Sequence, residues 1–296
     1  MTPSQFDVWL QLQSQPSLSD VFKKPLIMGV LNRTSDSFSD GGAFLSLEHA
    51  GEHALHLISC GADIIDIGGE STRPGASHVP LELELERVLP LIEYIRTYSD
   101  VCISIDTYKP EVMEAAVHAG ANIINDVYAL RQKGALAMAA QLAVPVCLMH
   151  MQGQPGTMQN NPQYPEGILH ELLNFFTDRI EACKNAGINT NQLLLDPGFG
   201  FGKNVADNLK VLACVKRFKD FNQPLLLGVS RKSTIGALLH KEVGERLIGG
   251  IAIAVYAALH GIALLRTHDV DETNQALHII DAIYQSQLQC NFDRGT

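Results

Sequence analysis

Eight short apolar runs recur along the chain, and each is followed by a polar or glycine-rich break and then by a segment of helical pattern. The runs are Leu26–Leu31, Asp63–Ile67, Cys102–Ile105, Ile123–Ile124, Val146–Met149, Leu193–Leu195, Leu225–Val229 and Ala263–Leu265. Apolar strands that alternate with helices are typical of a parallel sheet, and eight such units favour a closed barrel. We therefore expect an α/β fold, a (β/α)8 TIM barrel.

No linker or low-complexity stretch divides the 296 residues, a length that suits one large barrel. We expect residues 1–24 to form a short N-terminal extension that covers the bottom of the barrel. Residues 25–285 would form the barrel itself, and residues 286–296 a C-terminal tail. The segment 81–95 begins with strict alternation, which alone predicts a strand, but its later apolar residues restore helical spacing.

Charge and composition exclude several classes of protein. Lys and Arg number 22 against 32 Asp and Glu, a net charge of −10, which argues against a nucleic-acid partner. The first 25 residues lack the basic and apolar regions of a signal peptide. The six cysteines show no C-x-x-C spacing, which is typical of reduced thiols. We interpret the apolar run Ile248–Leu265 as a buried helix and a strand, and expect a cytoplasmic protein without a membrane partner.

Hydrogen-bonding or ionisable side chains follow every apolar run. In a (β/α)8 barrel the chemistry lies at the carboxyl ends of the strands. One Asp in such a place is more often a helix cap, but polar groups after all eight runs indicate a site. They include Asn32, Glu70, Asp106, Asn125, His150, Asp196, Ser230, Arg231, Lys232, Arg266 and His268.

The signs of these charges divide the expected site into two sides. The seventh and eighth runs are followed by cations, and loops in these places often bind phosphate in such barrels. The carboxylates of Asp106 and Asp196, with the amide of Asn125, suit the N–H donors of a planar heterocycle. Spacing alone thus predicts a polar planar ligand that carries phosphate. Mg²⁺ needs few protein ligands when a substrate supplies phosphate oxygens, and Asn32 is a candidate ligand.

Several other segments bear on catalysis. The segment 198–203 is glycine-rich but lacks the phosphate-loop pattern, and there is neither zinc-ligand spacing nor a Gly-x-Ser-x-Gly motif. We expect His150 to be a structural hydrogen-bonding group. The segments 37–42 and 72–75 combine Gly, Ser and Pro with polar side chains, which is typical of lids over barrel sites.

These motifs together resemble the dihydropteroate synthases of the pterin-binding barrel family, over roughly residues 25 to 285. The matching segments are 31–42 (LNRTSDSFSDGG), 66–75 (DIGGESTRPG), 104–107 (SIDT), 124–126 (IND), 148–153 (LMHMQG), 195–203 (LDPGFGFGK), 228–232 (GVSRK) and 266–270 (RTHDV). The resemblance implies a transferase that condenses (7,8-dihydropterin-6-yl)methyl diphosphate with 4-aminobenzoate, giving 7,8-dihydropteroate and diphosphate.

The resemblance also implies roles for individual residues. Asp106, Lys232, Arg266 and His268 would be catalytic, and Asn32 would touch Mg²⁺. The pterin diphosphate would be held by Thr72, Asp106, Asn125, Met149, Asp196, Lys232, Arg266, Thr267 and His268. The aminobenzoate pocket would be formed by Thr72, Arg73, Phe201, Ser230 and Lys232. Lys203 would brace Asp196 or a neighbouring loop.

The sequence departs from the family pattern in its first motif, where Ser35 replaces a proline and Arg33 a small apolar residue. The alternatives are a methyltetrahydrofolate-dependent methyltransferase of the same pterin-binding group, a non-catalytic pterin-binding subunit and a phosphate-binding isomerase. The helix predicted at 245–259 is apolar nearly all round. It either packs wholly against the barrel or also contacts a second copy, and we expect a homodimer.

Overall fold

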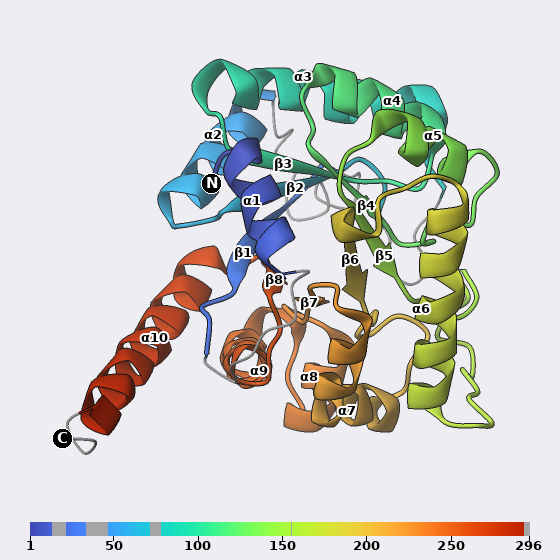
Figure 1. The fold of residues 1–296 in the computed structure, drawn as a ribbon. Helices are drawn as coiled ribbons and strands as arrows, with labels where there is room; N and C mark the ends of the chain where they lie inside the picture. Colours follow the sequence, from blue (N-terminus) through green and yellow to red (C-terminus); the bar gives the residue numbers. More distant parts are fainter. Residues whose placement is uncertain (14–21, 34–46, 72–77, 155, 293–296) are drawn as a thin grey trace.

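The structure is a computed structural model that describes residues 1–13, 22–33, 47–71, 78–154 and 156–292. Its eight strands are parallel and lie in the order β6-β5-β4-β3-β2-β1-β8-β7 (Figure 1). They are β1 (Leu26–Asn32), β2 (Ile64–Gly68), β3 (Cys102–Asp106), β4 (Ile123–Asp126), β5 (Val146–Met149), β6 (Leu193–Asp196), β7 (Leu226–Gly228) and β8 (Leu264–Thr267). A bridge from Leu195 to Leu225 links β6 to the start of β7. The predicted (β/α)8 TIM barrel is confirmed as a nearly closed barrel.

Helices follow the strands along the chain and surround them. They are α1 (Pro3–Gln13), α2 (Leu47–Ser59), α3 (Leu81–Tyr98), α4 (Pro110–Ala119), α5 (Ala135–Leu142), α6 (Ile168–Asn185), α7 (Val205–Ala213), α8 (Ser233–Leu239), α9 (Leu247–Leu259) and α10 (Val270–Phe292), with short 3₁₀ helices η2 (Thr190–Gln192), η3 (Val215–Phe221) and η4 (Val243–Glu245). The helix predicted from residue 81 is confirmed as α3. Its alternating start does not form a strand, because Val88, Ile92 and Ile95 are buried together on one helical face.

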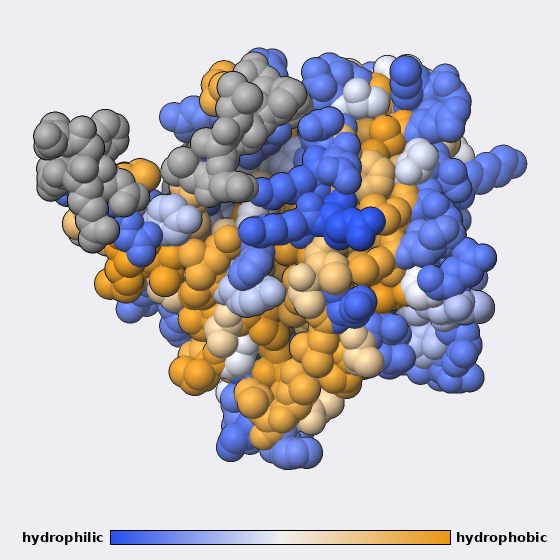
Figure 2. Space-filling model, turned by 60° about the horizontal axis from the view of Figure 1, so that its bottom comes forward, coloured by the Kyte–Doolittle hydropathy of each residue, from blue (hydrophilic) through white to orange (hydrophobic). Residues whose placement is uncertain are grey.

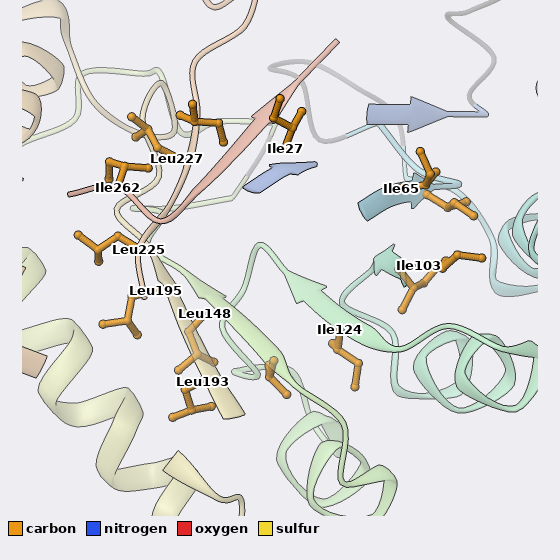
Figure 3. Packing of buried hydrophobic residues seen from close by; sticks show 14 of the residues in the cluster. Ile27, Ile65, Ile103, Ile124, Leu148, Leu193, Leu195, Leu225, Leu227 and Ile262 are labelled. Carbon is orange, nitrogen blue, oxygen red and sulfur yellow. The ribbon is translucent and has the colours of Figure 1, made fainter. Parts of the chain in front are cut away.

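Apolar side chains on the outer faces of the strands form the main core. Ile65 on β2, Ile103 on β3 and Leu148 on β5 are fully buried there beneath the surrounding helices. Figure 3 shows these side chains and their neighbours around the ring of strands. The short all-apolar runs of the sequence follow from this burial, since strands of a parallel sheet are covered on both faces.

The second core lies inside the barrel at its amino-terminal end. Met28, Ile64 and Leu264 belong to this layer, and Phe6 and Leu10 of α1 pack on it. Phe6 and Leu10 are 1% and 2% exposed. Helix α1 therefore covers the bottom of the barrel, while the extent of the N-terminal extension, residues 1–24, stays a prediction.

The boundary between the barrel and a C-terminal tail at residue 285 stays a prediction. Helix α10 continues through it to Phe292, and in Figure 1 the red end of this helix projects away from the barrel. Within the described ranges, no helix combines the length and apolar character that a membrane crossing requires.

Candidate active site

Polar side chains occupy the barrel interior directly above the apolar layer. Side chains alternate between the two faces of a strand, so a residue two positions beyond an interior residue also faces inward. Asp66 follows Ile64 in this way, and Arg266 follows Leu264. The same alternation places Asn125, Met149 and Asp196 inside the barrel, at the carboxyl ends of β4, β5 and β6.

Arg266 joins two carboxylates across the interior. Its Nε donates to Asp66 Oδ2 at 2.6 Å, and its Nη2 donates to Asp106 Oδ2 at 2.8 Å. Asn125 Nδ2 also faces Asp66, 3.3 Å from Oδ2. Asp66 is fully buried and was not among the residues selected from the sequence. The available signal was a carboxylate inside the second apolar run, where a charge requires a buried partner.

Asp106 retains the capacity to accept hydrogen bonds from a ligand. Burial raises the pKa of this carboxyl group, and the adjacent Arg266 opposes the shift. Its Oδ1 is buried and has no hydrogen-bond partner within the part of the chain that the structure describes. Because an unpaired buried acceptor is costly, this oxygen suits an N–H donor of a bound molecule.

Lys232 and Asp196 lie on the opposite side of the site with the loop that follows β6. Lys232 Nζ donates to the carbonyl of Phe199 and lies 4.6 Å from the ring centre of Phe201. Burial lowers the pKa of Lys232 to about 8, and the charge of Asp196 opposes this. Burial raises the pKa of Asp196, although Lys232 and the Gly198 N–H both favour its ionised form.

Ser230 and His268 meet at the ends of β7 and β8. The backbone N–H of His268 donates to Ser230 Oγ at 3.3 Å, and His268 Nδ1 lies 3.1 Å from the same oxygen. Ser230 Oγ donates to Asp269 Oδ2 at 2.9 Å, and Arg231 pairs with Asp269 Oδ1 at 2.7 Å. Asp269 thus holds both loops together.

Thr267 lies on the other face of β8 from Arg266, because side chains alternate along the strand. Its Oγ1 accepts from the N–H of Asp269 at 3.1 Å and from Thr273 Oγ1 of α10 at 3.3 Å. The Thr267 side chain is therefore directed toward α10 and is not brought together with the interior groups.

Asn32 reaches the site beside Asp106 because Gly68 lies between them. A Cβ placed on Gly68 would lie 2.9 Å from Asn32 Oδ1 and 3.6 Å from Asp106 Cβ. An amide oxygen there is a suitable single ligand for a hard cation. Among the residues that the structure describes, no group of three His, Cys, Asp or Glu side chains could hold a metal by itself.

Apolar and aromatic side chains border one side of the polar groups. Met149, Met151, Val127 and Met158 are buried in one cluster, and Phe201 packs against it. Thr72 and Arg73, like the segment 37–42, lie outside the described residues.

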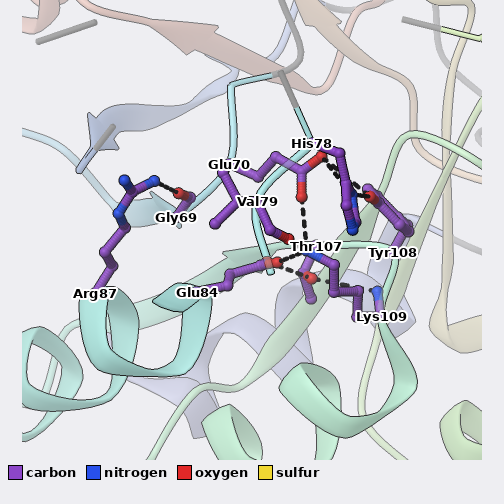
Figure 4. A network of polar contacts seen from close by, with 9 residues as sticks. All are labelled: Gly69, Glu70, His78, Val79, Glu84, Arg87, Thr107, Tyr108 and Lys109. Atoms are coloured by element: carbon purple, nitrogen blue, oxygen red, sulfur yellow. Dashed lines mark hydrogen bonds and ion pairs between the residues drawn. The ribbon is translucent and has the colours of Figure 1, made fainter. Parts of the chain in front are cut away.

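A buried ionic network connects β2, β3 and α3 beside the site (Figure 4). Lys109 Nζ donates to Glu70 Oε2 at 2.6 Å, to the carbonyl of Val79 at 2.7 Å and to Glu84. Thr107 Oγ1 donates to Glu84 Oε1 at 2.7 Å. Lys109 thus joins Glu70, which follows β2, to Val79, which precedes α3. No local pattern in the sequence indicates this network.

His150 is buried, and Lys203 Nζ lies 3.0 Å from its Nδ1. Burial lowers the pKa of His150 to about 2, and Lys203 acts in the same direction. The neutral ring is therefore a structural hydrogen-bonding group, as expected.

Comparison with known proteins agrees with this architecture. Residues 28–268 match the family model described as "Pterin binding enzyme", and the chain therefore belongs to the pterin-binding enzymes. Dihydropteroate synthase of Escherichia coli K12 is 52% identical over 258 residues, which cover 87% of this chain and 91% of that protein. Within its family, the chain is thus one of the dihydropteroate synthases.

Solved structures lead to the same assignment. Dihydropteroate synthase of Xanthomonas albilineans with 4-aminobenzoic acid has a TM-score of 0.83 at 49% identity, covering 88% of this chain and 93% of that one. The same enzyme in complex with 7,8-dihydropteroate has a TM-score of 0.79 at 45% identity, covering 90% and 95%.

Proposed function

We propose that this chain condenses (7,8-dihydropterin-6-yl)methyl diphosphate with 4-aminobenzoate in the polar interior of its barrel. The observation that carries this proposal is the convergence of Asp106, Asn125, Asp196 and Arg266 from four strands, with Asp106 Oδ1 lacking a partner within the described residues. This set can pair with the donor-rich edge of a pterin. The relatives described above support the reaction.

The pterin ring would be held at its edge by carboxylates and amides and at its face by apolar side chains. Asp106, Asp196 and Asn125 would accept from its N–H groups, and Lys232 would donate to an acceptor of the ring. Met149 is buried in the apolar cluster beside Phe201, where its thioether would lie against the ring.

The 4-aminobenzoate would lie between the loops that follow β6 and β7. Phe201 would contact its ring, while Ser230 and Lys232 would contact its polar ends. Thr72 and Arg73 are proposed to complete this pocket on the basis of the family resemblance.

The diphosphate would be bound at the ends of β1 and β8. Arg266 and His268 would bind its oxygens, and Asn32 would share a Mg²⁺ ion with it. When bound, Mg²⁺ would stabilise the charge that grows on the leaving diphosphate.

The protein side chains would then act mainly through electrostatics. As the C–O bond breaks, the methylene carbon becomes positive, and the Asp106 carboxylate beside it stabilises this charge. The aromatic amine of 4-aminobenzoate is neutral and nucleophilic at pH 7, so no strong general base is required. The new C–N bond then forms as diphosphate leaves, and the amine loses one proton to water or to the released diphosphate.

We also propose that two copies of the chain associate through the face formed by α8, α9 and α10. Large apolar side chains are exposed there, at Leu239 (49%), Ile248 (77%), Leu259 (44%), Ile279 (64%) and Ile283 (51%). Figure 2 shows a broad apolar surface on this side of the molecule, which lies at the bottom of Figure 1. Extended apolar surfaces of this kind mark interaction sites.

A cytoplasmic location completes the proposal. All six cysteines, each of which lies in the described part of the chain, are free thiols. Such thiols are typical of a reducing compartment.

The function is tested by measuring diphosphate release from the pterin substrate with and without 4-aminobenzoate. We expect release to require both substrates, and Asp106→Asn to lower kcat/KM by about a hundredfold or more because it removes the stabilising charge. Asp220→Asn, at an exposed position of η3, is the matched control and should retain the wild-type rate. Absence of release by the folded wild-type protein would overturn the assignment. Methyl transfer from methyltetrahydrofolate would favour the alternative.

A further inference from the structure

Side chains donate hydrogen bonds to five consecutive carbonyl groups of the loop that follows β6, residues 198–202. Lys203 Nζ donates to Gly198 O at 2.9 Å and to Phe201 O at 3.0 Å. Lys232 donates to Phe199 O, Gln159 Nε2 to Gly200 O at 2.6 Å and Tyr164 OH to Gly202 O at 2.5 Å. Loop carbonyls usually face solvent, so this arrangement specifies one conformation of the loop.

Lys203 connects this loop to the end of β5. Besides the two loop carbonyls, its Nζ lies 3.3 Å from the carbonyl oxygen of His150 and 3.0 Å from His150 Nδ1. Lys203 is only 3% exposed. An ammonium group has three N–H donors, and here four acceptors from two loops surround it. The buried Nζ group thus has protein partners from both segments.

The loop and the end of β5 approach each other so closely that only glycine fits at two positions of the loop. Gly198 has φ +68°, and a Cβ placed on it would lie 1.9 Å from the carbonyl oxygen of His150. A Cβ on Gly202, at φ +58°, would lie 2.8 Å from the carbonyl oxygen of Gln152. Two carbonyl-bearing segments therefore meet without side chains between them, and the Lys203 ammonium supplies the donors that they need.

The loop in turn carries groups of the aminobenzoate pocket. The carbonyl of Phe201 accepts a hydrogen bond from Lys203, and its ring lies beside Lys232 Nζ. A Cβ on Gly200 would lie 2.9 Å from Lys232 Cδ, so the loop also packs on the stem of that side chain. A displacement of the loop would move Phe201 and free Lys232, while Asp106, Asn125 and Arg266 lie on other strands.

We propose that Lys203 is a positioning residue for the aminobenzoate pocket, which it keeps in place by clamping the carbonyls of the 198–202 loop to the end of β5. The inference rests on the proposed function, since it assigns Phe201 and Lys232 to that pocket. Lys203 touches neither substrate and acts through the loop.

The test is Lys203→Met, which keeps most of the side-chain length and removes every donor. We expect the KM for 4-aminobenzoate to rise about tenfold. The dissociation constant of the pterin diphosphate, measured by calorimetry without 4-aminobenzoate, should change by less than about threefold. Asp196 and Lys232 contact the loop, but Asp106, Asn125 and Arg266 lie on other strands and would keep the pterin in place. Lys210→Met, at an exposed position of α7, is the matched control and should leave both constants unchanged.

Tyr164→Phe provides a second test, in which Lys203 itself is left unchanged. It removes one donor to the same loop, and we expect a smaller rise, of about threefold, in the KM for 4-aminobenzoate. An unchanged KM for 4-aminobenzoate in both variants would overturn the proposal. An equal rise in the KM for 4-aminobenzoate and in the dissociation constant of the pterin diphosphate would overturn it as well. A failure of the proposed function itself would differ, because wild-type protein would then release no diphosphate in response to 4-aminobenzoate.

Discussion

Arg266 shows how a single residue organises the interior of this barrel. Its guanidinium group pairs with Asp66 from β2 and with Asp106 from β3. Both carboxyl groups thus share one cation inside the barrel, and Lys232 lies on the other side with Asp196. Buried charges of this density are costly unless they are paired. The chain keeps them at the end of the barrel where chemistry takes place.

The lowered pKa of Lys232 predicts how activity depends on pH. A lysine is charged below its pKa, and the pKa of Lys232 is about 8. We therefore expect kcat/KM for the pterin diphosphate to fall above about pH 8, where the charged donor is lost. The measurement is a profile of kcat/KM between about pH 6 and pH 10.

Lys203 also titrates in this range, since burial lowers its pKa to about 7. Lys232→Arg therefore tests whether the fall in kcat/KM above about pH 8 comes from Lys232. A guanidinium group stays charged throughout the range, so the fall above about pH 8 should disappear even if the variant is slower. A variant that keeps the wild-type alkaline fall would exclude Lys232 as its source.

At the scale of elements, the two ends of the barrel have separate tasks. Helix α1 covers the amino-terminal end with Phe6 and Leu10, and the loops at the other end carry the site. Contacts that stabilise the first end can thus be altered without reaching the catalytic groups.

Phe6→Ala tests this separation. Phe6 is 1% exposed, so the truncation should lower the free energy of unfolding by about 3–5 kcal/mol. Urea unfolding measures this loss, and kcat at a temperature where the variant stays folded should equal that of the wild type. Val8→Ala, 58% exposed on the same helix, should change stability by no more than about 0.5 kcal/mol. A large loss of kcat in folded Phe6→Ala would mean that the two ends are coupled.

At the scale of the whole molecule, the apolar face of α8, α9 and α10 is the main unexplained surface. The long α10 adds Ile279 and Ile283 to it. If this face associates with a second copy, its burial supplies stability that the single chain lacks.

Ile248→Glu tests the dimer. A charge at this position, which is 77% exposed in the single chain, would be buried in the interface at high cost. Light scattering should give twice the chain mass of 32.3 kDa for the wild type and the single mass for the variant. Val8→Glu, on α1, serves as the control and should stay dimeric. A wild-type protein of single mass would refute the dimer.

Local patterns in the sequence were sufficient for the elements of the fold. All eight apolar runs overlap strands, and the helical spacing after residue 81 correctly predicts a helix there. The gathering of polar residues at one end of the molecule could also be predicted, because the carboxyl ends of all strands in a (β/α)8 barrel lie at the same end. The pairing of Arg266 with Asp66 did not follow, because the partners are far apart in sequence and ordinary in type.

What the sequence determined by itself is therefore the order of strands and helices and the chemical character of the residues at the strand ends, because burial and periodicity are local properties of the chain. Tertiary structure alone decided which of these groups meet. It directed Thr267 away from the interior, enclosed Lys109 between Glu70 and Glu84, and brought Lys203 to carbonyls of two loops. The physical reason is that each of these outcomes depends on strand register and on how closely two backbones approach, and neither is encoded within a single segment.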